Sequence, residues 1–180
     1  MKPGGEEIDR TWDYIPTAQF IGAVEGYQKG KGTLKATLAE EGQKGKDPEF
    51  VYQLGWKLYS HRMYDSADAR FAKVVALDSA NASGKADDAI LQRASICRRK
   101  EDWDGAVALS RDLLKRWPNG DLADDATIYI AYYSEKGGKK DQAITVYKEY
   151  LNRWPKGEDA DFAKEQLEAL QNPTLKEGGK

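Results

Sequence analysis

Two similar stretches of the chain decide its fold: RDLLKRWPNGDLADDA at residues 111–126 and KEYLNRWPKGEDADFA at residues 148–163. Both contain the triplet Arg-Trp-Pro, and the two triplets lie 37 positions apart. In both, a segment rich in acidic residues and alanine follows the proline. Self-similarity at a fixed spacing of about 20 to 50 residues is typical of repeat architectures. We therefore expect the chain to be built from stacked copies of one unit.

The segments before the two triplets have apolar residues three and four positions apart, which places these residues on one face of a helix. They are Ala106, Leu109, Leu113 and Leu114 in one segment and Ala143, Val146, Tyr147, Tyr150 and Leu151 in the other. A third copy at residues 64–78 has Ala67, Phe71, Val74 and Leu77 in the same frame. Another helix is expected before each copy, at residues 49–61, 86–99 and 122–135. The pattern predicts three helical hairpins in series.

The composition excludes several classes of function. The 30 acidic and 28 basic residues of the 180-residue chain nearly balance, and no run of lysine and arginine provides the clustered cations that a nucleic-acid backbone requires. A single cysteine and a single histidine leave little material for a metal site or a catalytic triad. No apolar run approaches the roughly 20 residues that span a bilayer. The mean hydropathy of -0.76 fits a soluble chain.

Three segments match a known helical hairpin, the tetratricopeptide repeat of about 34 residues. This repeat keeps a small residue early in its first helix and an alanine early in its second, where the two helices pass closely. Counted from residues 48, 87 and 124, the small residues are Gly55, Ala94 and Ala131, and the alanines are Ala67, Ala106 and Ala143. The second and third copies also end on the proline that is typical of the family, whereas the first has Ser79. The chain resembles tetratricopeptide-repeat proteins over about residues 48–157.

This resemblance implies an all-α fold, a right-handed α-solenoid of three hairpins with a C-terminal capping helix and an N-terminal helical extension. The expected parts are an extension at 1–47 that is partly helical, a repeat domain at 48–172 and a flexible tail at 173–180. Within the repeat domain, the hairpins are expected at 48–81, 87–120 and 124–157, and the capping helix at 159–170. After the proline turns, Asp121 and Asp159 are expected to cap the next helices.

Two interpretations of the N-terminal extension stay open. A helix is expected after Thr17 as N-cap, and a second short helix around Leu34 and Leu38. Together these helices would form a degenerate hairpin that covers the end of the repeats. In the alternative, the extension is an arm that folds back into the groove or onto a partner, an interpretation supported by the aromatic residues Trp12 and Tyr14.

In this family the first helix of each hairpin lines a concave groove. Carried over position by position, the predicted partner-binding residues are Tyr52, Trp56, Tyr59, Leu91, Ser95, Arg98, Arg99, Ile128, Tyr132 and Glu135. Aromatic and arginine side chains often anchor interfaces, because they combine a large contact area with directional polar groups. We therefore predict that the groove captures an extended or helical segment of another protein.

Both groups of groove residues have a second interpretation. The aromatic side chains Tyr52, Trp56 and Tyr59 could instead pack against residues 1–47, which would leave no free groove there. Arg98 and Arg99 close a helix, where cations interact favourably with the helix dipole. In this alternative, the chain is a structural subunit that assembles through its extension or its convex face.

The junctions with the Arg-Trp-Pro triplets also resemble those of bacterial envelope repeat proteins, namely the outer-membrane assembly lipoproteins and the Tol-Pal coordinator. This likeness covers about 50 residues and implies a periplasmic or envelope location and a membrane-associated complex, with the cytoplasm as the alternative. The function expected from the sequence is a non-enzymatic adaptor within a bacterial multi-protein complex. No catalytic residue, metal site, cofactor or nucleic-acid partner is expected.

Overall fold

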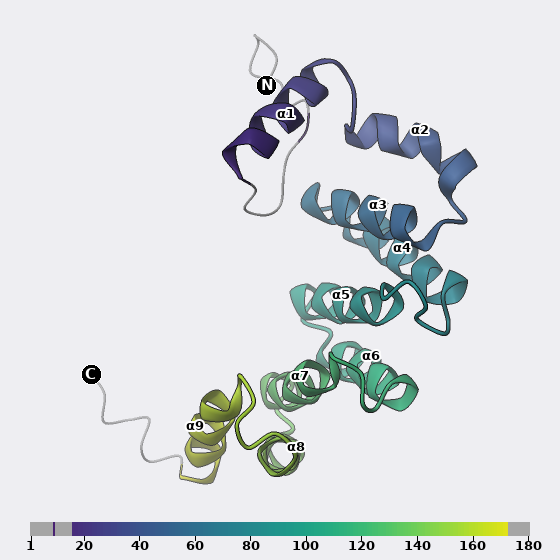
Figure 1. Ribbon diagram of the computed structural model, residues 1–180. Helices are drawn as coiled ribbons and strands as arrows, with labels where there is room; N and C mark the ends of the chain where they lie inside the picture. Colours follow the sequence, from purple (N-terminus) through teal and green to yellow (C-terminus); the bar gives the residue numbers. More distant parts are fainter. Residues whose placement is uncertain (1–8, 10–15, 173–180) are drawn as a thin grey trace. The chain divides into compact units, whose positions relative to one another are not determined.

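The computed structural model describes residue 9 and residues 16–172. The predictions for Trp12 and Tyr14 and for the tail at 173–180 fall outside these residues. Within the described part, all regular structure is α-helical, in nine helices (Figure 1). They are α1 (Thr17–Gln28), α2 (Leu34–Lys44), α3 (Pro48–Ser60), α4 (Tyr64–Leu77), α5 (Ala86–Arg99), α6 (Trp103–Arg116), α7 (Ala123–Lys136), α8 (Lys140–Arg153) and α9 (Ala160–Gln171).

The chain divides into two compact units, residues 1–89 and residues 90–180, and the division falls within α5. In the first unit, α3 and α4 pack as a hairpin and α2 packs against α3. In the second unit, α6 packs against α7, α7 against α8, and α8 against α9. Within each unit, the helices that pack together in these pairs are consecutive along the chain, as in stacked hairpins. The predicted boundaries at residues 47 and 172 are not tested by this division and stay a prediction.

The core of the first hairpin follows the periodicity of its sequence. Val51, Leu54 and Leu58 of α3 lie three and four positions apart and are at most 1% exposed. Phe71 and Val74 of α4 are fully buried. A helix of 13 or 14 residues is marginal in water on its own, so the burial of these faces is what stabilises the pair.

The two helices of each hairpin are joined by the same turn. The amides of Met63, Asp102 and Lys139 donate to carbonyl groups five residues earlier, at 3.0, 2.9 and 2.8 Å. In each turn the preceding residue has a positive φ, 60° at Arg62, 58° at Glu101 and 75° at Gly138. This is the hydrogen-bonding pattern of a Schellman motif, in which a left-handed residue ends the helix. The turn therefore repeats even where the sequence does not place a glycine.

The close approach of α3 and α4 depends on Gly55. A Cβ atom added at this position would lie 2.7 Å from a ring carbon of Phe71. Such a distance is well below an ordinary van der Waals contact, and the ring is enclosed by the rest of the core. The first hairpin therefore needs glycine where the later hairpins have Ala94 and Ala131.

We predict that Gly55→Ala lowers the free energy of unfolding by about 1 to 3 kcal/mol, because the new methyl group overpacks the core against Phe71. The matched control is Gly42→Ala in α2, where an added Cβ atom meets nothing within 4 Å. This control should raise stability by up to about 1 kcal/mol through helix propensity. Urea unfolding followed by circular dichroism measures both changes. Stabilisation of both variants would contradict the proposed close approach.

Candidate functional site

The second unit contains an open cavity of about 430 Å³. Three helices or their flanking residues line it. The lining residues are Leu91, Gln92, Ser95 and Arg98 from α5, Ile128, Tyr129, Tyr132 and Tyr133 from α7, and Asp159 and Phe162 at the start of α9. We call this surface the α5–α7–α9 groove. It crosses three helices, so an extended segment can contact all of them.

Helical spacing explains why these side chains meet. Leu91, Ser95 and Arg98 lie four and three positions apart and so share one face of α5. Other faces of the same helices carry small residues, and Ala94 and Ala131 are fully buried in the core of the second unit. The small residues let the helices pack closely, while larger side chains on the groove face stay accessible.

Aromatic rings dominate the groove. The rings of Tyr129 and Tyr133 are stacked, with centroids 5.8 Å apart, and Tyr132 meets Tyr133 edge to face at 5.7 Å. Tyr133 is only 3% exposed, so its buried ring supports the rings of Tyr129 and Tyr132. Tyr129 and Phe162 are 38% and 37% exposed. These two rings offer apolar surface that a partner can bury.

The charges of the groove are unevenly placed. Arg98 is an exposed cation on α5, and Asp159 lies at the start of α9. Burial, followed by the charges of neighbouring carboxylates, raises the pKa of Asp125 and of Asp159. Burial raises the pKa of Tyr133 to about 12, and it also raises that of Tyr129. The tyrosines are therefore neutral hydrogen-bonding groups at pH 7, next to carboxylates that repel one another.

In the first unit, the predicted aromatic residues form a packed cluster. Tyr52 is 8% exposed and its ring meets Phe71 at 5.7 Å. Trp56 contacts the rings of Tyr52, Tyr59 and Phe71, with centroid distances of 6.5, 5.4 and 6.2 Å. Burial raises the pKa of Tyr52 to about 12. Tyr52 thus serves the hairpin core and presents little surface to a partner.

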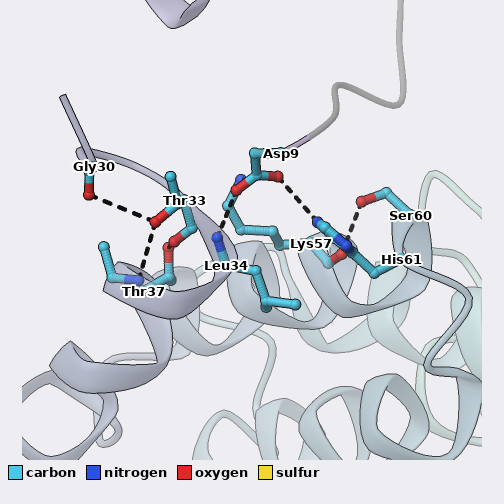
Figure 2. A network of polar contacts seen from close by, with 9 residues as sticks. Asp9, Gly30, Thr33, Leu34, Thr37, Lys57, Ser60 and His61 are labelled. Atoms are coloured by element: carbon cyan, nitrogen blue, oxygen red, sulfur yellow. Dashed lines mark hydrogen bonds and ion pairs between the residues drawn. The ribbon is translucent and has the colours of Figure 1, made fainter. Parts of the chain in front are cut away.

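A buried carboxylate links the N-terminal segment to α2 and α3 (Figure 2). The side chain of Asp9 is fully buried, and its Oδ1 atom lies 3.3 Å from Lys57 Nζ and 3.0 Å from His61 Nε2. Its Oδ2 atom accepts a hydrogen bond of 2.5 Å from the backbone amide of Leu34, the first residue of α2. Lys57 Nζ also lies 4.9 Å from the ring centre of Tyr27 in α1. Residue 9, α1 and α2 therefore meet at one face of α3.

In the part of the chain that the structure describes, no group of three histidine, cysteine, aspartate or glutamate side chains is placed to hold a metal ion. Of the helices formed by residues 16–172, none has the length and apolar character needed to cross a membrane.

Residues 125–157 match the family model of the tetratricopeptide repeat. The chain therefore contains a tetratricopeptide repeat at these residues. The match covers the hairpin of α7 and α8, which includes the middle of the groove. No curated protein matches the sequence significantly.

Solved structures resemble this chain over most of its length. A MamA protein has a TM-score of 0.59 at 17% identity, covering 89% of this chain and 86% of that one. MamA 41-end from Desulfovibrio magneticus RS-1 has a TM-score of 0.56 at 14% identity, with coverages of 90% and 97%. A putative kinesin light chain with TPR-like repeats from Podosopora anserina has a TM-score of 0.56 at 12% identity, with coverages of 87% and 95%. At these identities the likeness concerns the fold, and it confirms the predicted all-α solenoid of helical hairpins.

Five of the predicted groove residues line the cavity: Leu91, Ser95, Arg98, Ile128 and Tyr132. Arg99 and Glu135 do not. Glu135 instead accepts a hydrogen bond of 3.1 Å from the hydroxyl group of Tyr147, within the packing of α7 against α8. Partner binding by any of these residues stays a prediction.

The sequence interpretation missed five lining residues: Gln92, Tyr129, Tyr133, Asp159 and Phe162. Asp159 and Phe162 lie beyond the last repeat, so no position of the family pattern could be carried over to them. The sequence did contain a signal for Tyr129, because it is a large aromatic residue outside the predicted core face of its helix. Of the two predicted caps, Asp121 was wrong, because the N-cap of α7 is Leu122. Asp159 occupies the N-cap position of α9 as predicted, but its side chain makes no hydrogen bond to the helix.

We predict that Asp9→Ala loosens the attachment of the N-terminal segment, because it removes a buried partner of Lys57, His61 and the Leu34 amide. The cost in unfolding free energy should be about 1 to 3 kcal/mol. Hydrogen exchange of the first amides of α2 should accelerate. The control Glu40→Ala removes only an exposed pair with Lys44 and should change stability by less than about 0.5 kcal/mol. Unchanged exchange at Leu34 in Asp9→Ala would show that Asp9 does not anchor this segment.

Proposed function

We propose that this protein is a non-enzymatic interaction scaffold, and that it binds a segment of another protein in the α5–α7–α9 groove. The observation that carries this proposal is the pair of exposed rings, Tyr129 and Phe162, in an open cavity lined by three helices. Large apolar side chains are usually buried, and a cluster of accessible ones in a hollow is typical of a binding site.

The composition of the groove supports a protein partner. Tyrosine and arginine are enriched among the residues that contribute most to protein interfaces, and the groove has three tyrosines and Arg98. The tyrosine hydroxyl groups provide hydrogen bonds, while their rings provide contact area at a low cost in conformational entropy. Binding would cover Tyr129 and Phe162 and leave the supporting residue Tyr133 in place.

A second candidate function is a structural subunit that assembles through its N-terminal extension or its convex face. The contacts of Asp9 favour it for the first hairpin, because they hold the N-terminal segment against α3. They do not involve the lining residues of the α5–α7–α9 groove. The two functions can therefore be separated by variants in the groove and by measurement of the oligomeric state with sedimentation.

We further propose that the partner belongs to a bacterial multi-protein complex in the cell envelope, periplasmic or membrane-associated. The resemblance of the Arg-Trp-Pro junctions to those of bacterial envelope repeat proteins supports this location. Fractionation of cells that express the native gene tests it. Recovery of the protein solely in the cytoplasm would refute the envelope location and leave the binding proposal standing.

We predict that Tyr129→Ala weakens peptide binding by about tenfold or more, because truncation of an exposed anchor in a groove removes its contact area. The probe is a random 16-residue peptide library displayed on phage, from which binders of the unmodified protein are synthesised and their Kd values measured by fluorescence anisotropy. Phe20→Ala is the matched control, because it truncates a ring on α1 that is more exposed than Tyr129, at 48% against 38%, and lies outside the groove. Circular dichroism verifies folding. Equal Kd values for unmodified protein and Tyr129→Ala would refute binding in this groove.

A further inference from the structure

A group of carboxylates, which we call the acidic end, lies at the starts of α7 and α9 or just before them: Asp121, Asp124, Asp125, Glu158 and Asp159. Of these, Asp159 lines the groove. Their mutual repulsion is felt at Asp125, whose pKa is raised first by burial and then by the charges of the other four. Among the described residues, no lysine, arginine or histidine forms an ion pair with any of the five. The acidic end is therefore a concentration of negative charge that no ion pair within the described part of the chain neutralises.

Local structure does not use these carboxylates as helix caps. Asp159 occupies the N-cap position of α9, yet its side chain makes no capping hydrogen bond, and it lines the cavity instead. The N-cap residue of α7 is Leu122, so Asp121 does not cap that helix either. The dipole at the helix start favours acidic residues by a modest amount only, and this does not explain why an acidic residue lines the groove at position 159.

Each of two acidic residues precedes an exposed ring on its own helix. Asp125 lies four positions before Tyr129, and Asp159 lies three positions before Phe162, so each pair shares a helix face. Charges from both helices reach Tyr129, because Asp125 and Asp159 each contribute to the rise in its pKa. Acidic groups from α7 and α9 thus converge on the most exposed part of the aromatic surface.

A lysine or arginine side chain matches this arrangement. Its aliphatic stem packs on an aromatic surface, while its charged group stays near carboxylates. The groove already contains such a contact, because Lys136 Nζ lies 5.2 Å from the ring centre of Tyr132. That contact occupies Tyr132, whereas Tyr129 and Phe162 remain exposed beside the acidic end.

We propose that the partner of the α5–α7–α9 groove is a basic segment, in which a lysine or arginine next to an apolar residue binds between the acidic end and the rings of Tyr129 and Phe162. This inference rests on the proposed function and specifies its partner. Arg98 lines the same groove, and its positive charge lowers the pKa of Tyr129, in opposition to the effect of Asp125 and Asp159. Its guanidinium group interacts favourably with a hydrogen-bond acceptor or an acidic group of the partner. A segment that presents acidic side chains to α9 would be repelled.

The test begins with the peptides selected from the random library. Among the peptides that bind Tyr129→Ala more weakly than the unmodified protein, lysine and arginine next to apolar residues should be enriched. The best of these peptides is then compared with a version in which its basic residues are replaced by glutamine. The variant that removes the charge without changing the shape is Asp125→Asn with Asp159→Asn. We expect it to weaken the basic peptide by about tenfold and to leave the glutamine peptide unchanged.

The matched control is Asp141→Asn with Asp161→Asn. Both aspartates lie in the first turn of a helix, as Asp125 does, but neither lines the groove. This pair has the same change in net charge, so it should leave the Kd of the basic peptide within about twofold at moderate salt concentration, where distant charges are screened. The variant Asp125→Asn with Asp159→Asn removes charges that repel one another. Thermal unfolding should therefore show that it is at least as stable as the unmodified protein.

The outcomes separate this inference from the proposed function. If peptides depend on Tyr129 but show no basic enrichment and bind Asp125→Asn with Asp159→Asn normally, the basic partner is refuted and groove binding stands. If no selected peptide depends on Tyr129, both proposals fall. Equal weakening by the control pair would also refute the inference, because it would indicate only a general charge effect. Self-association that is lost in Tyr129→Ala, seen by sedimentation, would identify a second copy as the occupant and overturn the proposal.

Discussion

The close approach of two helices within each hairpin is the constraint on which the rest of the structure depends. Helices can approach closely only where the facing side chains are small, and the residues at these positions are buried without exception: Gly55, Ala67, Ala94, Ala106, Ala131 and Ala143. With small residues on the inner faces, the larger apolar side chains interdigitate to either side. Stability then comes from contacts between neighbouring helices, and no long-range strand pairing is needed.

This constraint also leaves a helix face free to line the α5–α7–α9 groove. When one face of a first helix is committed to the hairpin core and another to the next helix, a remaining face stays free to carry side chains that do not contribute to packing. On α7 this face carries Tyr129 and Tyr132, with Tyr133 buried behind them. Residues there can change without loss of the core. This separation explains how a scaffold with one packing rule can present aromatic rings, an arginine and unbalanced carboxylates in one groove.

The repeat spacing predicted the helices closely. The helix expected at 86–99 is α5, and those expected at 49–61 and 122–135 differ from α3 and α7 by one residue at each end. The groove was predicted less completely, because the family pattern could be carried over only inside the three repeats. It placed Arg98 and Tyr132 at the cavity but could not include Phe162, which enters from α9. It also assigned Tyr52 to the groove, whereas that ring is nearly buried against Phe71.

The sequence by itself determined the hairpins, because the helical period, the small residues at the crossings and the proline junctions are local or repeat at a fixed spacing. Only the tertiary structure decided which polar groups meet. Asp9 contacts Lys57 and His61, which lie about 50 positions away, and no periodic signal marks such a pairing. Likewise, Asp125 and Asp159 belong to different helices, and their convergence on Tyr129 depends on how α9 packs against α8. Periodic patterns specify which face of a helix is buried, whereas the neighbours of an accessible side chain follow from how the helices pack.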